Sequence, residues 1–96
     1  MKKLYVISRL DLSTSQQAVQ AGHAVAKAVQ HGLDTDWNGT LVYLGVDSED
    51  KLAFWGTKLT AKGINWIGFR EPDIGHQLTA IAAVDEGKVF SNLKLL

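Results

Sequence analysis

The chain has 96 residues, enough for one domain with one hydrophobic core, and its 10 basic and 10 acidic residues balance, so overall charge gives no reason to expect a nucleic-acid partner. Without cysteine it has no disulfide, no thiol nucleophile and no thiolate metal ligand. No apolar run could cross a bilayer and the start, MKKLYVISRLDL, is too short for a signal peptide, so we expect one cytoplasmic domain, residues 1–96, without membrane contact.

Strands and helices are predicted to alternate along the chain, because β-rich apolar segments are interleaved with segments that carry helix-capping signals. In chain order these are a strand at 3–9, a helix from 13 or 14 to about 31, a strand at 40–46, a helix from 48 to about 62, and strands at 64–69 and 78–84. The stretch DEGKVFSN then predicts one helical turn. The terminal LKLL predicts either a short last strand or a cap on the sheet edge.

This order favours an α/β sandwich around a mixed sheet of four main strands. Only a short loop separates the last two strands, so they are either antiparallel neighbours or not adjacent. On the first helix the apolar stripe is predicted to contain Ala18, Ala21, Val25 and Val29. The predicted buried core consists of Val6, Val42, Leu44, Ile67 and Ile81, flanked by Ala21, Val25, Leu52 and Leu59.

A line of polar side chains runs along the same helix. Gln16, Gln20, His23 and Lys27 follow one another at spacings of four, three and four, which places them on one face. That face is either solvated or borders a site at the end of the sheet. His23 is then either a general acid or base, or a helix histidine bonded to a carbonyl or carboxylate.

The loop FREPDIGH concentrates ionisable groups just before the last long strand. Glu71 and Asp73 lie two apart in a predicted extended segment, so both can face one side, where one could orient a water while the other holds a cation, or they belong to a polar turn. Which of the two acids would act stays open. His76 is either a site residue or a solvent-facing loop histidine, and Arg9, at the end of the first strand, either holds phosphate or pairs with an acid.

Other chemistries have little support in the residues present. There is no nucleophile elbow and no P-loop, and the three histidines lack the spacing of a zinc site. We therefore expect no metal and no cofactor, and the available side chains suit attack by an activated water better than a covalent nucleophile.

The stretch SRLDLSTSQQAVQAGHAVAKA resembles the opening of the second type of peptidyl-tRNA hydrolase, a family typical of archaea and eukaryotes. That opening has a strand, Arg-x-Asp-Leu, a Gly/Lys-rich turn, and a helix bearing Gln-x-x-His-Ala. Later, KGINWIGFRE is similar to a strand ending in Arg-Asp, LTAIA to a strand bearing threonine, and NLKLL to the family's ending. The matching residues here are Arg9, Asp11, Leu12, Gln20, His23, Ala24, Glu71 and Thr79.

The resemblance implies a three-layer α/β/α sandwich with a four-stranded mixed sheet, often a homodimer, that cleaves the ester between a peptide and tRNA. A dimer is also what the apolar NLKLL end predicts, since a second copy could cover that edge. The implied catalytic residues are His23, Glu71, Asp73 and Thr79. The implied substrate-binding residues are Arg9, Asp11, Gln16, Gln20, Lys27 and His76.

Two departures from the family pattern leave a second hypothesis open. The turn before the first helix is two residues shorter and has no lysine, and Gln16 stands where the family has the lysine thought to act in catalysis. The acidic loop is also shorter. The sequence therefore predicts either an ester hydrolase or a non-catalytic or altered-substrate relative that acts as a binding module.

Overall fold

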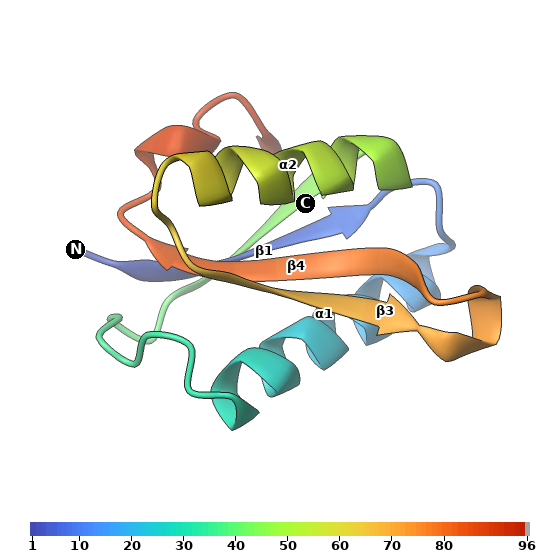
Figure 1. The fold of residues 1–96 in the computed structure, drawn as a ribbon, viewed down its shortest axis with the longest axis horizontal. Coiled ribbons are helices and arrows are strands. Elements are labelled where there is room, and N and C mark those ends of the chain that lie inside the picture. Colours follow the sequence, from blue (N-terminus) through green and yellow to red (C-terminus); the bar gives the residue numbers. More distant parts are fainter. Residues whose placement is uncertain (96) are drawn as a thin grey trace.

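The structure, a computed structural model, describes residues 1–95 and places a twisted sheet between one helix on each of its faces (Figure 1). The four predicted strands and two predicted helices are all present, and a two-residue fifth strand follows them. In chain order the elements are β1 (Lys3–Arg9), α1 (Thr14–Gln30), β2 (Leu41–Val46), α2 (Glu49–Ala61), β3 (Trp66–Glu71), the 3-10 turn η1 (Pro72–Ile74), β4 (Gln77–Asp85), the 3-10 turn η2 (Lys88–Phe90) and β5 (Lys94–Leu95).

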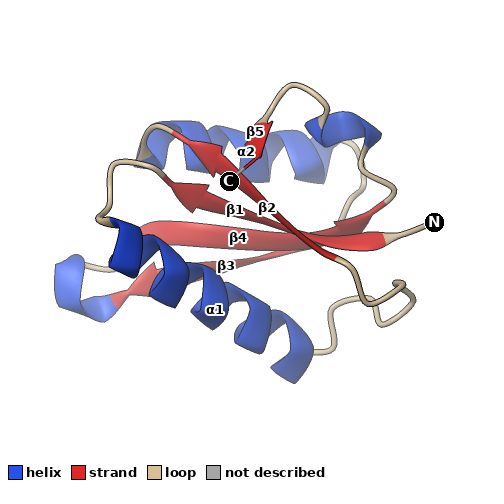
Figure 2. Cartoon of the chain, turned by 180° about the vertical axis from the view of Figure 1, so that it is seen from behind, coloured by secondary structure: helices blue, strands red, loops and turns tan. Residues whose placement is uncertain are grey.

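The sheet is mixed and has the strand order β3-β4-β1-β2-β5 (Figure 2). β1 and β2 are parallel, and β4 runs antiparallel to both β1 and β3. The prediction of a small α/β domain with a mixed sheet is confirmed. The short loop between β3 and β4 makes them antiparallel neighbours, which settles one alternative that the sequence left open.

Both helices begin at serine caps. The Ser13 hydroxyl accepts a hydrogen bond from the backbone N–H of Gln16 at 3.2 Å. The Ser48 hydroxyl does the same for the N–H of Lys51, also at 3.2 Å. Each bond satisfies an amide that has no partner within its own helix, so the short segments before α1 and α2 set where the helices start.

The two faces of the sheet have separate hydrophobic cores, because alternate side chains of each strand point to opposite sides. α1 packs on one face and α2 on the other. The core under α1 contains Leu4, Val6, Ala21, Ala24, Ala28, Ala80, Ala82 and Val84. The core under α2 contains Tyr5, Ile7, Leu44, Val46, Leu52, Trp55, Leu59, Leu78, Ile81, Ala83 and Phe90. The predicted core residues therefore divide between two cores, and Val25, Val42 and Ile67 are half-buried.

The predicted apolar stripe of α1 is wrong in its rotation. Val29 is 67% exposed and Ala18 is exposed too, whereas the buried side of the helix carries Gln20, Ala21 and two further alanines. Alanine side chains let the helix axis come close to the sheet, so the helix buries its smallest residues and leaves a large valine outside. This rotation turns the polar line of α1 toward β3 and β4.

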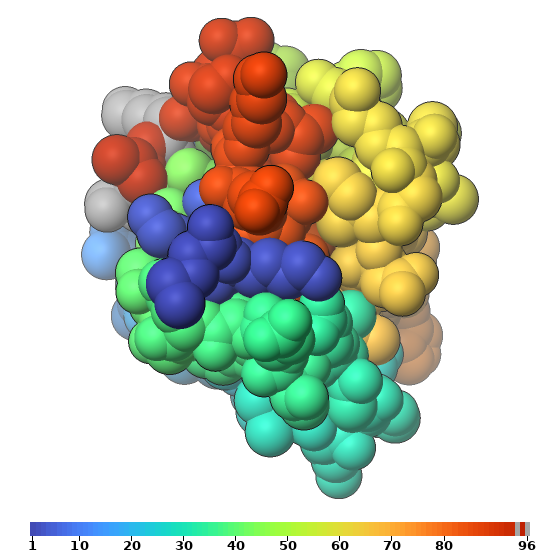
Figure 3. All heavy atoms as spheres, turned by 90° about the vertical axis from the view of Figure 1, so that its left-hand side faces the viewer, coloured from blue at the N-terminus to red at the C-terminus, as the bar shows by residue number. Residues whose placement is uncertain are grey.

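The N-terminal residues are tied to two loops. Lys2 donates to the Asp34 carboxylate at 2.8 Å, and its carbonyl accepts from the N–H of Asn38. The Met1 amino group lies 3.8 Å from the Glu86 carboxylate. Figure 3 shows the first residues lying between the segment after α1 and the end of β4.

The C-terminal segment pairs within the chain. β5 lies antiparallel beside Leu44 and Gly45 of β2, so it covers part of that edge, and Leu96 lies outside the described residues. The homodimer stays a prediction. In residues 1–95 no helix is both long and apolar enough to cross a membrane.

Two helical glycines allow a matched test of packing between α2 and β3. A Cβ built on Gly56 would lie 2.7 Å from Cζ2 of Trp66, whereas one built on Gly22 of α1 would meet nothing within 4 Å. We expect Gly22→Ala to stabilise the fold by about 0.5–1 kcal/mol through helix propensity. We expect Gly56→Ala to destabilise it by about 1–3 kcal/mol, because the indole must move. Urea unfolding of both variants measures this, and equal stability of the two would refute close helix–strand contact at Trp66.

Candidate active site

The polar residues predicted to form a site gather at the end of the sheet where β1 ends and β4 begins. β1 and β3 both run antiparallel to β4, so their carboxyl ends lie at this end, together with the start of α1. Figure 2 shows η1 and the first turn of α1 at this same end of the molecule. Two hydrogen-bonded groups form there, one on each face of the sheet. The remaining predicted residues lie farther along α1 or on the loop after β3.

A shift in the pairing of β3 with β4 positions the first group of residues. Phe69 of β3 pairs with Ala80 of β4, but the next residue, Arg70, pairs with Leu78. Thr79 is thus left without an opposite residue, as in a β-bulge. In a regular strand, Leu78 and Ala80 would point to the same face of the sheet. The bulge interrupts this alternation of side chains, so Leu78 lies in the core under α2 and Ala80 in the core under α1. Thr79 also turns to the side of α1.

The threonine–glutamine network, formed by Thr79, Gln20 and Gln16, links β4 to α1. The Thr79 hydroxyl lies 2.8 Å from Oε1 of Gln20, to which it donates, and 3.2 Å from the Phe69 carbonyl. Nε2 of Gln20 donates to Oε1 of Gln16 at 3.2 Å. Thr79 is fully buried and Gln20 is 2% exposed, but Gln16 is exposed. The network therefore runs from the interior to the surface. Thr79 has no contact with solvent of its own and is linked to the surface only through the two glutamines.

The rest of the polar line of α1 lies along β3. The His23 imidazole packs on the ring of Phe69, with 4.5 Å between the ring centroids. Nζ of Lys27 donates to the carbonyl of Gly68 at 2.9 Å. His23 itself is exposed, so its ring nitrogens can meet a ligand, whereas the Lys27 ammonium already holds an edge carbonyl.

The second group is an arginine clamp, made by Arg9, Asp11 and Gln77. The Arg9 guanidinium donates to both carboxylate oxygens of Asp11, at 3.0 and 2.7 Å, and to Oε1 of Gln77 at 2.8 Å. Arg9 is only 6% exposed. Its hydrogen bond lowers the pKa of Asp11 below the usual value, and the same bond raises the pKa of Arg9. Of the two roles that the sequence left open for Arg9, pairing with an acid is the one observed.

The clamp also completes the backbone hydrogen bonding of β4. Pairing between β1 and β4 ends at Ser8 and Ala80, one residue short of the shifted segment. Beyond it, the carbonyl of Leu78 accepts from Nη1 of Arg9 at 3.2 Å, and its N–H donates to the Glu49 carboxylate at 2.7 Å. Two side chains thus replace the missing strand. Sequence reasoning missed the roles of Glu49 and Gln77, and its only related signal was the presence of acids in the first turn of α2.

The acidic loop differs from the prediction of an extended segment. Pro72–Ile74 form a 3-10 turn, so Glu71 and Asp73 are not alternate residues of a strand. His76 is exposed, with a φ of 58°, which is uncommon for a residue with a side chain, and its N–H bonds to the Glu71 carbonyl at 2.9 Å. Across residues 1–95, no hydrogen bond or ion pair joins the side chains of Glu71, Asp73 or His76 to α1.

Glu71 nevertheless lies toward the start of α1. The contacts Lys27–Gly68 and His23–Phe69 show that α1 and β3 run in opposite directions side by side. Two further strand residues span about 6.6 Å, which equals roughly four helix residues. This register puts Glu71 near the level of Gln20, whereas Asp73 lies in the turn that follows β3.

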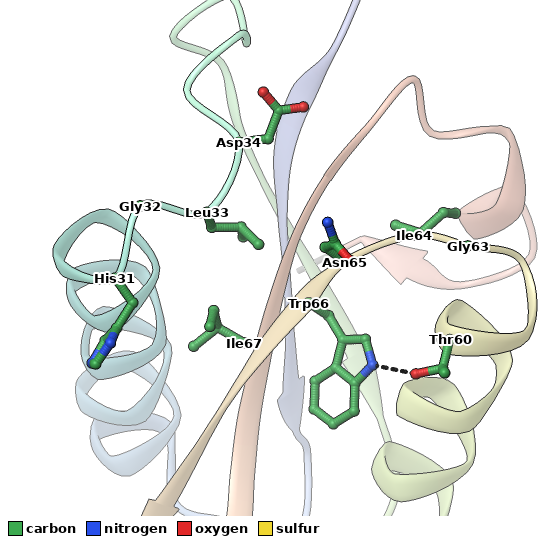
Figure 4. A pocket seen from close by; sticks show the side chains of 10 residues that line it. All are labelled: His31, Gly32, Leu33, Asp34, Thr60, Gly63, Ile64, Asn65, Trp66 and Ile67. Atoms are coloured by element: carbon green, nitrogen blue, oxygen red, sulfur yellow. Dashed lines mark hydrogen bonds between the residues drawn. The ribbon is translucent and has the colours of Figure 1, made fainter.

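No cluster of three His, Asp, Glu or Cys side chains in the described part of the chain could hold a metal ion. A cleft of about 490 Å³ lies at the opposite end of the sheet, beyond the ends of both helices (Figure 4). It contains Trp66, whose indole donates to the Thr60 hydroxyl, but none of the predicted site residues. A second open cleft, of about 450 Å³, follows β3 and includes Lys27, Phe69 and Arg70.

No protein-family model matches the sequence. No curated protein matches it either. A solved structure that does match is that of Atu0240, a protein of unknown function from Agrobacterium tumefaciens C58. The alignment has a TM-score of 0.71 and 17% sequence identity, and it covers 99% of this chain and 97% of that one. At this identity the likeness shows that the two chains share a fold.

The threonine–glutamine network makes a prediction about stability. Thr79→Val removes the hydroxyl and leaves the buried carbonyl oxygen of Gln20 without its donor, so we expect a loss of about 1–3 kcal/mol. Adding Gln20→Met removes the other partner and should recover most of that loss. Chemical unfolding of both single variants and the double variant gives the coupling, and strictly additive effects would show that the two side chains do not act as a pair.

The arginine clamp predicts a pH dependence. Because the folded protein lowers the pKa of Asp11, the ion pair stabilises the fold above the unfolded value of about 4, and this contribution is lost as pH falls through the lower folded value. Asp11→Asn should therefore lower the unfolding midpoint at pH 7 but make little difference at pH 2. Asp50→Asn, at an exposed acid of α2, is the control. An Asp11→Asn deficit that is the same at both pH values would contradict the prediction.

Proposed function

We propose that this protein is an ester hydrolase of the second peptidyl-tRNA hydrolase type, with that family's three-layer sandwich, and that it cleaves an ester between an acyl group or peptide and tRNA. The helix-on-each-face arrangement agrees with such a sandwich. The substrate implies a cytoplasmic location and a tRNA partner. A homodimer is part of the same proposal.

One observation carries the proposal. Four of the positions that give rise to the resemblance bond to one another in two pairs, one between neighbours in the sequence and one between distant segments. Arg9 clamps Asp11, and Thr79 bonds to Gln20 across 59 positions of the chain. Gln16, in the place of the family lysine, lies at the exposed end of that network.

The proposed reaction uses water as the nucleophile. Glu71 takes a proton from a water that attacks the ester carbonyl carbon, and the bond from that carbon to the ribose oxygen breaks as the oxygen is protonated. The exposed side-chain amide of Gln16 and the unpaired N–H groups at the start of α1 donate to the carbonyl oxygen as it gains charge, and the nearly buried Gln20 holds Gln16 in place. His23, farther along the same helix face, is the proposed proton donor to the ribose oxygen. Thr79 has a positioning role, since it holds Gln20.

The cleft along β3 suits the tRNA end of such a substrate. Arg70 and Lys27 lie on it, and Phe69 and Trp66 add aromatic surface. Cationic groups favour phosphate and aromatic rings favour unpaired bases. Asp73 and His76, exposed on the loop after β3, would then contact substrate rather than take part in proton transfer.

A binding module that lacks catalysis is the second candidate. Two observations favour it, namely the complete burial of the Thr79 hydroxyl and the presence of an uncharged Gln16 where the family has lysine. Such a protein would keep the same fold and bind an acylated or nucleic-acid ligand without turnover.

Hydrolysis of peptidyl-tRNA by the purified chain tests the proposal. We expect turnover, and we expect Glu71→Gln or His23→Ala to lower kcat/KM by about a hundredfold, the scale for losing a positioned acid or base. Asp73→Asn should cost less than Glu71→Gln, because the register of β3 and α1 favours Glu71. Asp50→Asn on α2 is the control for charge. Absence of turnover would overturn the hydrolase proposal and leave the binding module.

Gln16→Lys tests the role of the missing lysine. An ammonium at the exposed end of the network would stabilise the oxyanion, so we expect activity to rise by about tenfold or more. Gln30→Lys, at the other end of α1, adds the same charge far from the network and should leave activity unchanged. Equal gains in both variants would indicate general attraction of tRNA rather than catalysis.

A further inference from the structure

α1 does not cover its face of the sheet evenly. It packs over β4, β3 and β1, while the side of β2 that faces the same way stays partly open. Leu41 and Tyr43 of β2 are 44% and 37% exposed, although their partners in β1, Leu4 and Val6, are buried. The flank of α1 next to β2 is therefore a place where the molecule is hollowed.

A small cleft of about 150 Å³ occupies this flank. Its floor is β1, one wall is α1 and the other is the Tyr43 side chain. The lining residues are Ser8, Thr14, Gln17, Ala18, Ala21 and Tyr43. None of them is charged, and the two alanines leave room that larger side chains would fill. The polar line of α1 lies about 140° away around the helix, so the cleft lies on a different side of α1 from Gln16, Gln20 and His23.

Ser8 distinguishes the cleft from an ordinary gap in packing. The residue is only 1% exposed, yet its hydroxyl makes no hydrogen bond within residues 1–95. Among the described residues every fully enclosed polar side-chain atom has a partner, so the Ser8 hydroxyl must reach the small opening that it lines. Leaving a nearly buried hydroxyl unpaired is unfavourable, and such groups are rare in folded proteins.

Other polar atoms at the rim are used differently. Nε2 of Gln17 donates to the backbone carbonyls of Leu10 and Leu12, which fixes the chain just before α1. The side-chain oxygen of Gln17, Oε1, is left as an acceptor. The Tyr43 ring supplies an aromatic wall. The site thus combines a mainly apolar surface with one deep hydroxyl, the usual make-up of a site for a small neutral ligand.

We propose that this cleft binds a compact neutral group, the size of one aromatic ring, that carries a single hydroxyl and hydrogen-bonds to Ser8. A volume of about 150 Å³ is that of an apolar protein cavity known to take benzene. An ion is disfavoured because no charged side chain lines the cleft to replace its hydration. The ligand class is therefore phenols and similar ring alcohols, and the site is independent of ester hydrolysis.

Titration of the ¹⁵N-labelled chain with phenol, followed by amide chemical shifts, tests the proposal. We expect saturable shifts centred on Ser8, Thr14, Ala18 and Tyr43, with a millimolar dissociation constant. Toluene, which has the ring without the hydroxyl, should bind more weakly. Ser8→Ala should weaken phenol binding about fivefold to tenfold, the scale of one hydrogen bond, and should not weaken toluene binding.

Two substitutions on α1 separate this site from general adhesion of phenol. Ala18→Leu should fill the cleft from its exposed side and abolish the shifts, while Ala26→Leu, also exposed on α1 but outside the cleft, should preserve them. Both positions are exposed, so the fold should tolerate either change. Shifts that fail to saturate, or that persist unchanged in Ala18→Leu, would overturn the proposal.

Discussion

The loss of register between Phe69 and Arg70 is the feature on which the polar architecture depends. One extra residue in β4 sends Leu78 to the core under α2 and Thr79 to the side of α1. Without that shift, strict alternation would put Thr79 on the face of α2, away from Gln20. A bulge costs regular pairing, and the Thr79 hydroxyl compensates by lying within hydrogen-bond distance of both Gln20 and the Phe69 carbonyl.

The same place explains why a nearly buried arginine is tolerated. Because β1 stops pairing with β4 at Ala80, the amide and carbonyl of Leu78 need other partners, and Glu49 and Arg9 supply them. The charge of Arg9 is balanced by Asp11 at its open side. Each of these polar and charged groups has a hydrogen-bond partner among the others, as the burial of a charge requires. Arg9 therefore holds the end of the sheet together.

The fold followed largely from local signals, whereas the site did not. Serine caps and runs of β-forming residues are signals that span only a few consecutive residues, and they predict every long element, including the start of α1 at Thr14. Helix rotation is decided by packing, so Ala24 and Ala28 displaced the predicted stripe ending at Val29. The bulge at Thr79 and the turn after Glu71 depend on contacts between distant segments, which periodicity does not encode.

The buried network limits what chemistry is available. A hydroxyl with no exposed surface cannot contact an ester, so Thr79 can affect a substrate only by holding the side chain of Gln20. Gln20 is itself nearly buried and bonds to Gln16, which is the exposed member of the network. In the proposed hydrolase, catalysis at this end of the sheet would then rely on amides, the start of α1, one nearby acid and His23. The hydrolase and the binding module share all of these groups, and in both an uncharged Gln16 stands where the family has lysine. The difference between them reduces to whether neutral donors suffice to stabilise a developing oxyanion, which is a question of preorganised electrostatics rather than of fold.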